Sequence, residues 1–215
     1  DCLGVYGVAR DLAAAGLGTL KAQNTTAVEG QFANPQKVVL DAPEICPVFE
    51  GRFIRGVKNG PSPEWLQKKL RALGMKPISI LVDITNLMTY DSGVIGLGGV
   101  MGGTSTGCSE STTNVFVEAA WFDPISIATA GRTLGIDSDA RYRFERGVDP
   151  DTMVPGIEIA TRLILDLCGG EASKAVVTGT IPTISKTVHL RPSCVGHLGG
   201  VDVSEGEIIT ILSDL

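Results

Sequence analysis

The sequence predicts an α+β fold, with a mixed sheet and helices packed on it. Three observations lead to this class. Helical and strand-like segments follow one another without the regular β-α-β alternation of a doubly wound fold. Hydrophobic residues make up 43% of the chain and charged residues 20%, as in globular proteins. With 215 residues, the chain is long enough to bury a core in one large or two modest domains.

The first sixty residues predict a helix, a loop and strands, in that order. Residues 1–16 place apolar side chains at helical spacing and are followed by glycines. Residues 20–36 are polar and loop-like, and residues 37–58 have a strand-like pattern.

A helix and then a strand are expected next. The stretch "PSPEWLQKKLRALG" predicts a helix in which Ser62 is the cap, Pro63 occupies the first position and Gly74 follows the end. Its apolar stripe contains Trp65, Leu66, Leu70 and Leu73. The stretch "ISILVDITN", residues 78–86, predicts a strand.

The second half of the chain alternates between the two element types. The stretch "TNVFVEAA", residues 113–120, predicts a strand. The pairs Asp123-Pro124 and Asp149-Pro150 each predict a helix start, because a cap precedes a first-turn proline. A strand is expected at "KTVHLRPS" after a proline-containing connector, and Ser204 and Glu207 have the spacing of a capping box.

Composition excludes several function classes. The net charge of −6 and pI near 4.9 mean that any nucleic-acid contact must come from a local basic patch. No apolar run is long enough to span a membrane. Five widely spaced cysteines without a C-x-x-C pair argue against a zinc site or a disulfide framework and favour a reducing cytosol. With only two histidines, His189 and His197, a Ser–His or Cys–His centre in mid-chain is not expected.

A glycine-rich segment, "GVIGLGGVMGG", contains six glycines between Gly93 and Gly103. It is not a Walker loop, because Thr104 stands where the lysine is required, and no register gives the dinucleotide fingerprint. The exposed backbone can approach a ligand closely, but for this segment alone a strand followed by a tight turn is the favoured interpretation.

Glu118 is the first candidate functional residue. Side chains alternate along the strand 113–120, so Val115, Val117 and Ala119 share one face while Phe116 and Glu118 share the other with Asn114. A carboxylate among apolar neighbours is costly unless it is hydrogen-bonded. Two interpretations remain open: a structural glutamate held by backbone amides, or an acceptor for a ligand's hydroxyl or amine.

Basic residues suggest two nucleic-acid contacts. In "DSDARYRFERGVDP", residues 137–150, arginines alternate with aromatics, which suits phosphate and base contacts. A solvated strand with ion pairs is the alternative. Between Arg52 and Lys76 seven basic residues face one acid, Glu64, which is an expected RNA-backbone track unless it is only a solvated helix face.

Together these motifs resemble one family. The stretches "GRFIRGVKNGPSPEWLQKKLRALGMKPISILVDITN", "GVMGG", "VFVEAAWFDPISI", "DARYRFERGVDP" and "ATRLILDLCGGE" resemble the B3/B4 region of the beta subunit of bacterial phenylalanine–tRNA ligases, in the family's order. The resemblance implies three parts. Residues 1–40 are the end of a B1-like region with a linker, 41–180 a B3/B4-like editing domain, and 184–215 the start of a small, winged-helix-like α/β B5-type domain.

The family's B3/B4 module hydrolyses tyrosine that is wrongly esterified to tRNA(Phe). By motif, the resemblance implies an editing site made of Thr85, Asn86, Gly102, Glu118, Ser138 and Ala140. Glu118, Gly102, Ala140 and Phe116 would contact the substrate. Ser138 stands where the family commonly has Thr, which keeps the hydroxyl. The expected tRNA contacts are Arg52, Arg55, Lys68, Lys69, Arg141 and Arg143.

The expected chemistry is ester hydrolysis by a positioned water. A site that hydrogen-bonds a substrate hydroxyl can reject the analogue lacking it by about 10⁴–10⁵, so a buried acceptor such as Glu118 suits selection of tyrosine over phenylalanine. The amides near Gly102 could stabilise an oxyanion. One departure matters: the family's "PLHAFD"-like motif, with an editing-site histidine, and several tens of further residues are missing near Tyr90–Ser92.

For the whole enzyme the resemblance implies a cytoplasmic alpha2beta2 assembly. The alpha subunit would supply the synthetic site, ATP and magnesium would serve the whole enzyme, and this region would need no metal or cofactor. The alternative function is a noncatalytic scaffold that binds tRNA or the alpha subunit. A free-standing editing protein is disfavoured by the flanking B1-like and B5-like pieces.

Overall fold

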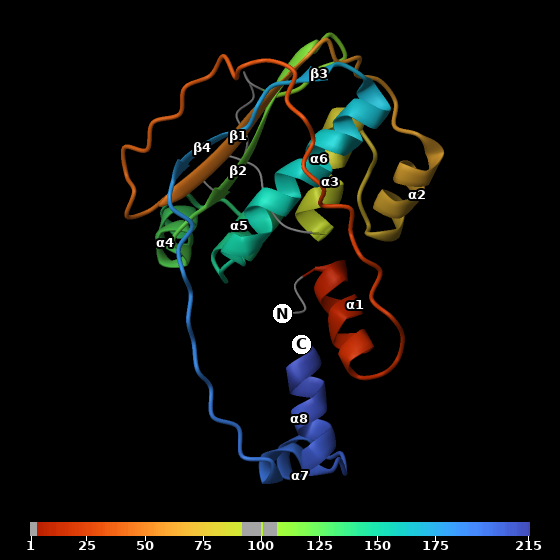
Figure 1. Cartoon of the computed structure of the whole chain (residues 1–215), viewed down its shortest axis with the longest axis vertical. Coiled ribbons are helices and arrows are strands. Elements are labelled where there is room, and N and C mark those ends of the chain that lie inside the picture. Colours follow the sequence, from red (N-terminus) through yellow and green to blue (C-terminus); the bar gives the residue numbers. More distant parts are fainter. Residues whose placement is uncertain (1–3, 92–99, 101–106) are drawn as a thin grey trace. The chain divides into compact units, whose positions relative to one another are not determined.

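The computed structural model describes residues 4–91, 100 and 107–215 (Figure 1). The chain divides into two compact units. The larger is Asn24–Pro182, and the smaller combines Asp1–Gln23 with Thr183–Leu215. Strands and helices together bear out the α+β class.

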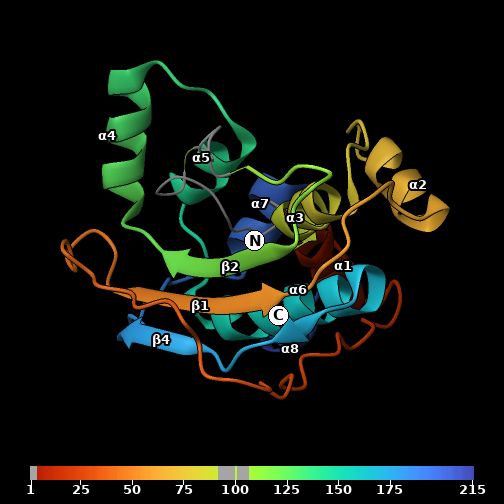
Figure 2. The ribbon, with the colours of Figure 1, turned by 90° about the horizontal axis from the view of Figure 1, so that it is seen from above.

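The larger unit is built on a four-stranded sheet. Strand β1 (Val48–Arg55) pairs along its whole length with β2 (Asn114–Trp121) and on its other side with β3 (Glu171–Ala172) and β4 (Val176–Gly179). Figure 2 shows β2, β1 and β4 side by side. These ladders are all antiparallel, and a parallel pairing occurs in the described chain only as the bridge between Phe32 and Ser173. The expected mixed sheet is therefore an antiparallel one.

One face of the sheet, the inner face, packs on helix α6 (Met153–Cys168). Alternate residues of β1, including Val48 and Ile54, and Val117 of β2 join the buried stripe of α6, which contains Ile157 and Ile164. The expected alternation of β2 side chains between the two faces of the sheet is confirmed. The expected start before α6 is also confirmed, because the carboxylate of Asp149 accepts a hydrogen bond from the N–H of Asp151 in the 3₁₀ turn η1 (Pro150–Thr152).

Residues 80–91 form helix α3 (Ile80–Asp91), so the expected strand 78–86 is wrong. A continuous apolar run fits a strand or a buried helix, and tertiary packing selects between them. Here Ile80, Ile84 and Met88, four residues apart, point into the core beside α6. Before the helix, Asp83 accepts the N–H of Ile78, which helps to end the extended chain.

Helix α2 (Glu64–Ala72) agrees with its expected position but not with its expected cap. Leu66 and Leu70 are fully buried. Pro63 is the N-cap and makes no side-chain hydrogen bond, while Ser62 donates its hydroxyl to buried Asp83 at 2.6 Å. The helix begins one residue later than expected, so Ser62 precedes the N-cap position and its hydroxyl bonds Asp83 of α3.

Helices α4 (Pro124–Leu134) and α5 (Asp139–Phe144) surround a second, smaller core. Asp123 caps α4 as expected, accepting the N–H of Ser126. The alternating segment 137–150, for which a solvated strand was the alternative to nucleic-acid contacts, is helical at α5, so its arginines and aromatics do not alternate between two faces. Phe144 is buried against Val100 and Ile127, which is the helix's packing contribution.

The smaller unit contains helices α1 (Val5–Ala14), α7 (Ser193–Gly199) and α8 (Glu205–Asp214). The expected capping box is present at Ser204 and Glu207. The strand expected at residues 186–192 is absent from the described chain: these residues are exposed and have no face to bury. No helix within the described ranges is both long and apolar enough to span a bilayer.

Candidate functional site

The outer face of the sheet, opposite α6, carries the candidate acceptor Glu118. In an antiparallel pair, directly opposed residues share a face, so Glu118 shares this face with Gly51 and Phe116 shares it with Phe53. The neighbouring β1 residue on the same face is Phe49. We define the outer face by these five residues. Four of the five are apolar or lack a side chain, so Glu118 has apolar neighbours along the strands, while Arg55 and Asn114 lie on the same face at the end of the strand pair.

The Glu118 side chain is half-buried and carries no hydrogen bond or ion pair to the part of the chain that the structure describes. Burial raises the pKa of this carboxyl above its ordinary value, because desolvation disfavours the charged form. Of the two interpretations left open by the sequence, a glutamate satisfied by backbone amides finds no such amide among the described residues. That Glu118 serves as an acceptor for a ligand remains a prediction.

Aromatic rings and a thiol form the surroundings of Glu118. The rings of Phe49 and Phe116 are stacked, with centroids 6.2 Å apart and planes at 13°. Burial raises the pKa of the Cys46 thiol, and the charge of Glu118 adds to that rise. A planar apolar ligand with one hydroxyl has two partners here: aromatic rings for its apolar part and the Glu118 carboxylate for its hydroxyl.

Ser138 and Ala140 lie at a second place, the start of α5. The hydroxyl of Ser138 accepts the N–H of Arg141 as an N-cap and donates to the carbonyl of Val100. Ala140 packs against the small core that contains Val100. Val100 belongs to the "GVMGG" motif, two residues before Gly102. The structure thus joins α5 to this motif at Val100, while Gly102 itself lies outside the described residues.

Thr85 and Asn86 lie in the middle of α3, not on a strand. The hydroxyl of Thr85 donates to the carbonyl of Leu81 at 3.1 Å. Within the described ranges, no hydrogen bond or ion pair joins Glu118 to Thr85, Asn86 or Ser138. That the six motif residues converge on one substrate remains a prediction.

Arg52 is buried, so its expected tRNA contact is wrong. It is 4% exposed on the inner face and forms an ion pair with Glu158 of α6, at 2.8 Å between Nη2 and Oε1. Its Nη1 also donates to the carbonyl of Val28, and Glu158 accepts the N–H of Val28 at 2.6 Å. The pair therefore fastens the extended segment around Val28 to the core.

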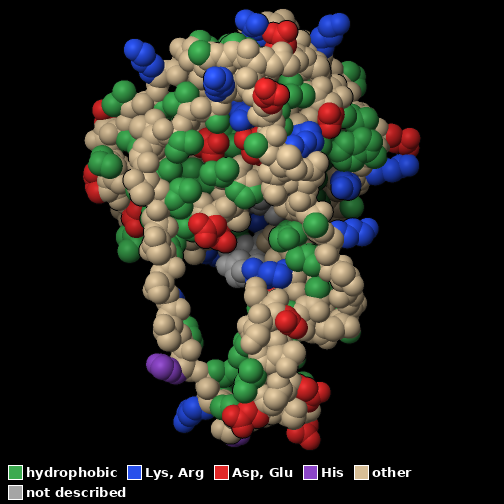
Figure 3. Space-filling model, in the orientation of Figure 1, with side chains coloured by type: hydrophobic (Ala, Val, Ile, Leu, Met, Phe, Trp, Pro, Cys, Tyr) green, Lys and Arg blue, Asp and Glu red, His purple; other side chains and the backbone are tan. Residues whose placement is uncertain are grey.

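The remaining basic candidates differ in exposure. Arg55 is exposed, pairs with Glu171 at 2.7 Å and lies over the Phe32 ring. Lys68 and Lys69 are exposed on α2, and Figure 3 shows basic side chains at the edge of the larger unit where this helix lies. Arg141 and Arg143 are half-buried on α5. An RNA track on α2 and β1 stays a prediction, without Arg52.

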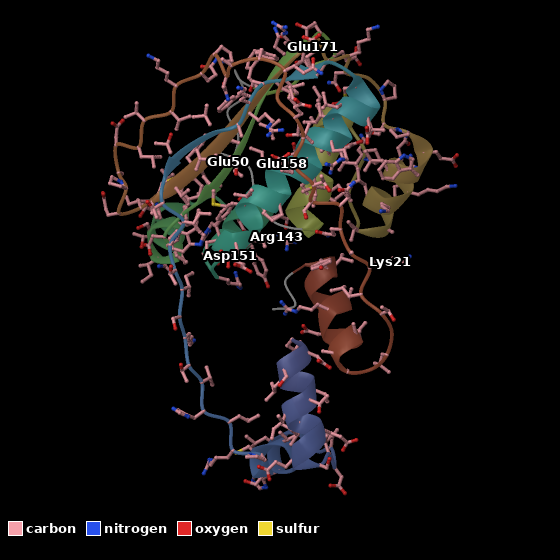
Figure 4. The ribbon with its side chains drawn as sticks, in the orientation of Figure 1. Lys21, Glu50, Arg143, Asp151, Glu158 and Glu171 are labelled. Carbon is pink, nitrogen blue, oxygen red and sulfur yellow. The ribbon has the colours of Figure 1, made fainter. Side chains whose placement is uncertain are left out.

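The sequence interpretation missed a buried acidic pair. Figure 4 shows Glu50 and Glu158 between β1 and α6. Glu50 is 2% exposed, and burial, followed by the charge of Glu158, raises its pKa to about 7 although Arg52 opposes the rise. The available signal was the alternation of Val48, Glu50, Arg52 and Ile54 along β1, which places both charged residues on the core side. Within the described chain, no group of three or more His, Cys, Asp or Glu residues could hold a metal ion.

Comparison with known proteins shows the family to which the chain belongs. A family profile described as B3/4 domain matches residues 45–94 and 87–169. The two matched segments overlap at residues 87–94, a range that includes Tyr90–Ser92.

Curated relatives match the whole chain. The phenylalanine–tRNA ligase beta subunit of Paramagnetospirillum magneticum is 48% identical over 267 residues, covering 100% of this chain and 34% of the relative. Those of Mesorhizobium japonicum and Rhodospirillum rubrum are 46% and 45% identical, covering 100% of the chain and 33% and 34% of the relatives. The chain spans about a third of the length of these relatives. The chain belongs to the B3/4 domain family and is homologous throughout to phenylalanine–tRNA ligase beta subunits.

Proposed function

We propose that this chain is the editing module of a phenylalanine–tRNA ligase beta subunit, which hydrolyses tyrosine wrongly esterified to tRNA(Phe). The observation that supports this most is Glu118, an unpartnered carboxylate within the described chain, beside stacked Phe49 and Phe116. Its chemistry suits a phenol: the rings pack against the aromatic part, and the carboxylate accepts the hydroxyl hydrogen.

The discrimination follows from this arrangement. A ligand that lacks the hydroxyl leaves the half-buried carboxylate without a partner, and a site of that kind rejects such a ligand by up to about 10⁴–10⁵. The phenylalanyl ester is therefore not hydrolysed. Ionised Glu118 is the competent form, because only the carboxylate accepts without competing as a donor.

Water is the proposed nucleophile. The two histidines, His189 and His197, lie in the segment after the larger unit, so no histidine of that unit can act as a base. Backbone amides of the "GVMGG" motif, which Ser138 adjoins through Val100, are the proposed oxyanion donors. Thr85 and Asn86 are proposed to position the water or the ribose.

The rest of the enzyme is proposed from the relatives' printed name, phenylalanine–tRNA ligase beta subunit. An alpha subunit would complete an alpha2beta2 enzyme in the cytoplasm and would supply the synthetic site, with ATP and magnesium as its cofactors. tRNA(Phe) is the proposed nucleic-acid partner, contacted by the exposed residues Arg55, Lys68 and Lys69. The parts 1–40, 41–180 and 184–215 are proposed to be B1-like, B3/B4-like and B5-like.

A noncatalytic scaffold is the second candidate, and one observation favours it. The chain has no counterpart of the family's "PLHAFD"-like histidine motif between "DITN" and the glycine segment. Without that histidine, the site could bind the aromatic group and fail to hydrolyse the ester.

Deacylation of tyrosyl-tRNA(Phe) by the full chain tests the proposal, with phenylalanyl-tRNA(Phe) as the control substrate. We expect hydrolysis of the tyrosyl ester only, and its loss in Glu118→Ala. Glu110→Ala is the matched control, because Glu110 is exposed and is not one of the paired residues of β1 and β2. Tyrosine binding without hydrolysis in the folded chain supports the scaffold. Hydrolysis of both esters at equal rates refutes editing by Glu118.

A further inference from the structure

We infer that Gly51 is a positioning residue for the tyrosine site: by lacking a side chain it lets the Phe116 ring lie across β1 and form an aromatic floor beside Glu118. The inference rests on the proposed function for its ligand. Its structural half, the seating of Phe116 by Gly51, can be tested separately.

The strand register shows how far Phe116 leans. Gly51 is directly opposite Glu118, and Phe116 is directly opposite Phe53. A Cβ atom on Gly51 would nevertheless lie 2.2 Å from Cζ of Phe116. The ring therefore extends from its own position over the backbone of Gly51. The ring thereby occupies the space beside Glu118, because Gly51 and Glu118 are directly opposite each other.

The backbone conformation at position 51 does not require a glycine. Gly51 is not among the glycines with positive φ, so any residue could adopt its backbone. A glycine inside a central strand weakens it, and a close approach by another group is the usual reason for one. Here the approaching group is the Phe116 ring. The carbonyl of Gly51 accepts a hydrogen bond from the side chain of Asn34 at 3.1 Å, which holds this part of the floor in place.

The position of the Phe116 ring over Gly51 determines which kind of ligand the site suits. Phe116, whose ring lies over Gly51, stacks on Phe49, so two roughly parallel rings lie on the face that carries Glu118. The partial burial of Glu118 limits the water available to its carboxylate, so a hydroxyl from the ligand contributes more there than in water. Displacing the ring would remove the aromatic contact and hydrate the carboxylate together. Both changes weaken selection of tyrosine over phenylalanine.

The test compares Gly51→Ala with Gly60→Ala in the full chain. Gly60 lacks positive φ and has open space where a Cβ would be added, so it is a matched control. We measure affinity for L-tyrosine and L-phenylalanine by calorimetry. Gly51→Ala is expected to weaken tyrosine binding about tenfold, the order of one aromatic contact, and Gly60→Ala to leave it unchanged.

A double-mutant cycle distinguishes a displaced Phe116 ring from a folding defect as the cause of weaker tyrosine binding. Phe116→Ala removes the ring, so Gly51→Ala added to it meets no clash and should fold normally. If Gly51 acts by seating Phe116, the double variant binds tyrosine as weakly as Phe116→Ala alone. Additive losses would overturn the inference, because Gly51 would then act through another group.

A second readout separates this inference from the proposed function. The carboxyl titration of Glu118, followed by carbon NMR, should move toward the ordinary glutamate range in Gly51→Ala and stay in place in Gly60→Ala. If the original chain does not prefer tyrosine, the proposed function fails, and this titration still decides whether Gly51 seats the ring. An unchanged titration in Gly51→Ala overturns the inference.

Discussion

Replacing Glu158 with glutamine should cost the larger unit much of its stability. The side chains of Arg52 and Glu158 are 5% and 7% exposed, so their charges are almost fully removed from water. Glutamine keeps the size of glutamate and therefore creates no cavity. What it removes is the negative charge that compensates buried Arg52.

The expected loss can be worked from the contacts. Glu158 accepts two hydrogen bonds from Arg52, at 2.8 and 3.3 Å, and one from the N–H of Val28 at 2.6 Å. Hydrogen bonds to charged groups contribute about 1.5–3 kcal/mol each. The amide still has one oxygen acceptor, so part of this is retained. Breaking one side of a buried pair costs about 3–5 kcal/mol, and we expect Glu158→Gln to fall in that range.

Urea unfolding followed by tryptophan fluorescence measures this loss in the relevant unit, because Trp65 and Trp121 both belong to Asn24–Pro182. The midpoint should fall at unchanged slope. We would work at about pH 5, where Glu50, with its pKa near 7, is largely protonated and supplies little replacement charge.

Glu171→Gln is the matched control for Glu158→Gln. Glu171 also pairs with an arginine, Arg55, but the two side chains are 49% and 54% exposed. An exposed pair contributes about 0–1 kcal/mol. Equal losses in the two variants would refute the reasoning, since burial could not then be what makes the Arg52–Glu158 pair indispensable.

Three further predictions follow from other contacts. Glu50→Gln should stabilise the chain increasingly as pH rises from the ordinary glutamate range to about 7 and by a constant amount above that, because the raised pKa of Glu50 means that folding opposes its ionisation; pH-dependent urea midpoints that run parallel for both proteins would contradict this. Asp123→Ala should cost about 0.5–2 kcal/mol in unfolding free energy by removing the cap bonds to Ser126, and an unchanged midpoint would exclude that role. Lys68→Ala with Lys69→Ala should reduce the salt slope of tRNA binding by about 2 in filter binding at several salt concentrations, whereas an unchanged slope would remove α2 from the RNA track.

Local sequence determined the features that depend on neighbours along the chain. Asp123 and the Ser204–Glu207 box each satisfy helix N–H groups within three residues, so their roles could be predicted without tertiary structure. The alternation along β2 likewise placed Val117 inward and Glu118 on the opposite face.

Tertiary structure decided what depends on distant partners. The apolar run at residues 78–86 fits a strand or a helix, and only packing beside α6 makes it helical. Arg52 resembles a surface cation in sequence, but its partner Glu158 is 106 residues away. The Phe116 ring over Gly51 depends on the register between two strands far apart in the chain. Periodicity reports the face on which a side chain lies, whereas the group that meets it there is set by how the elements pack.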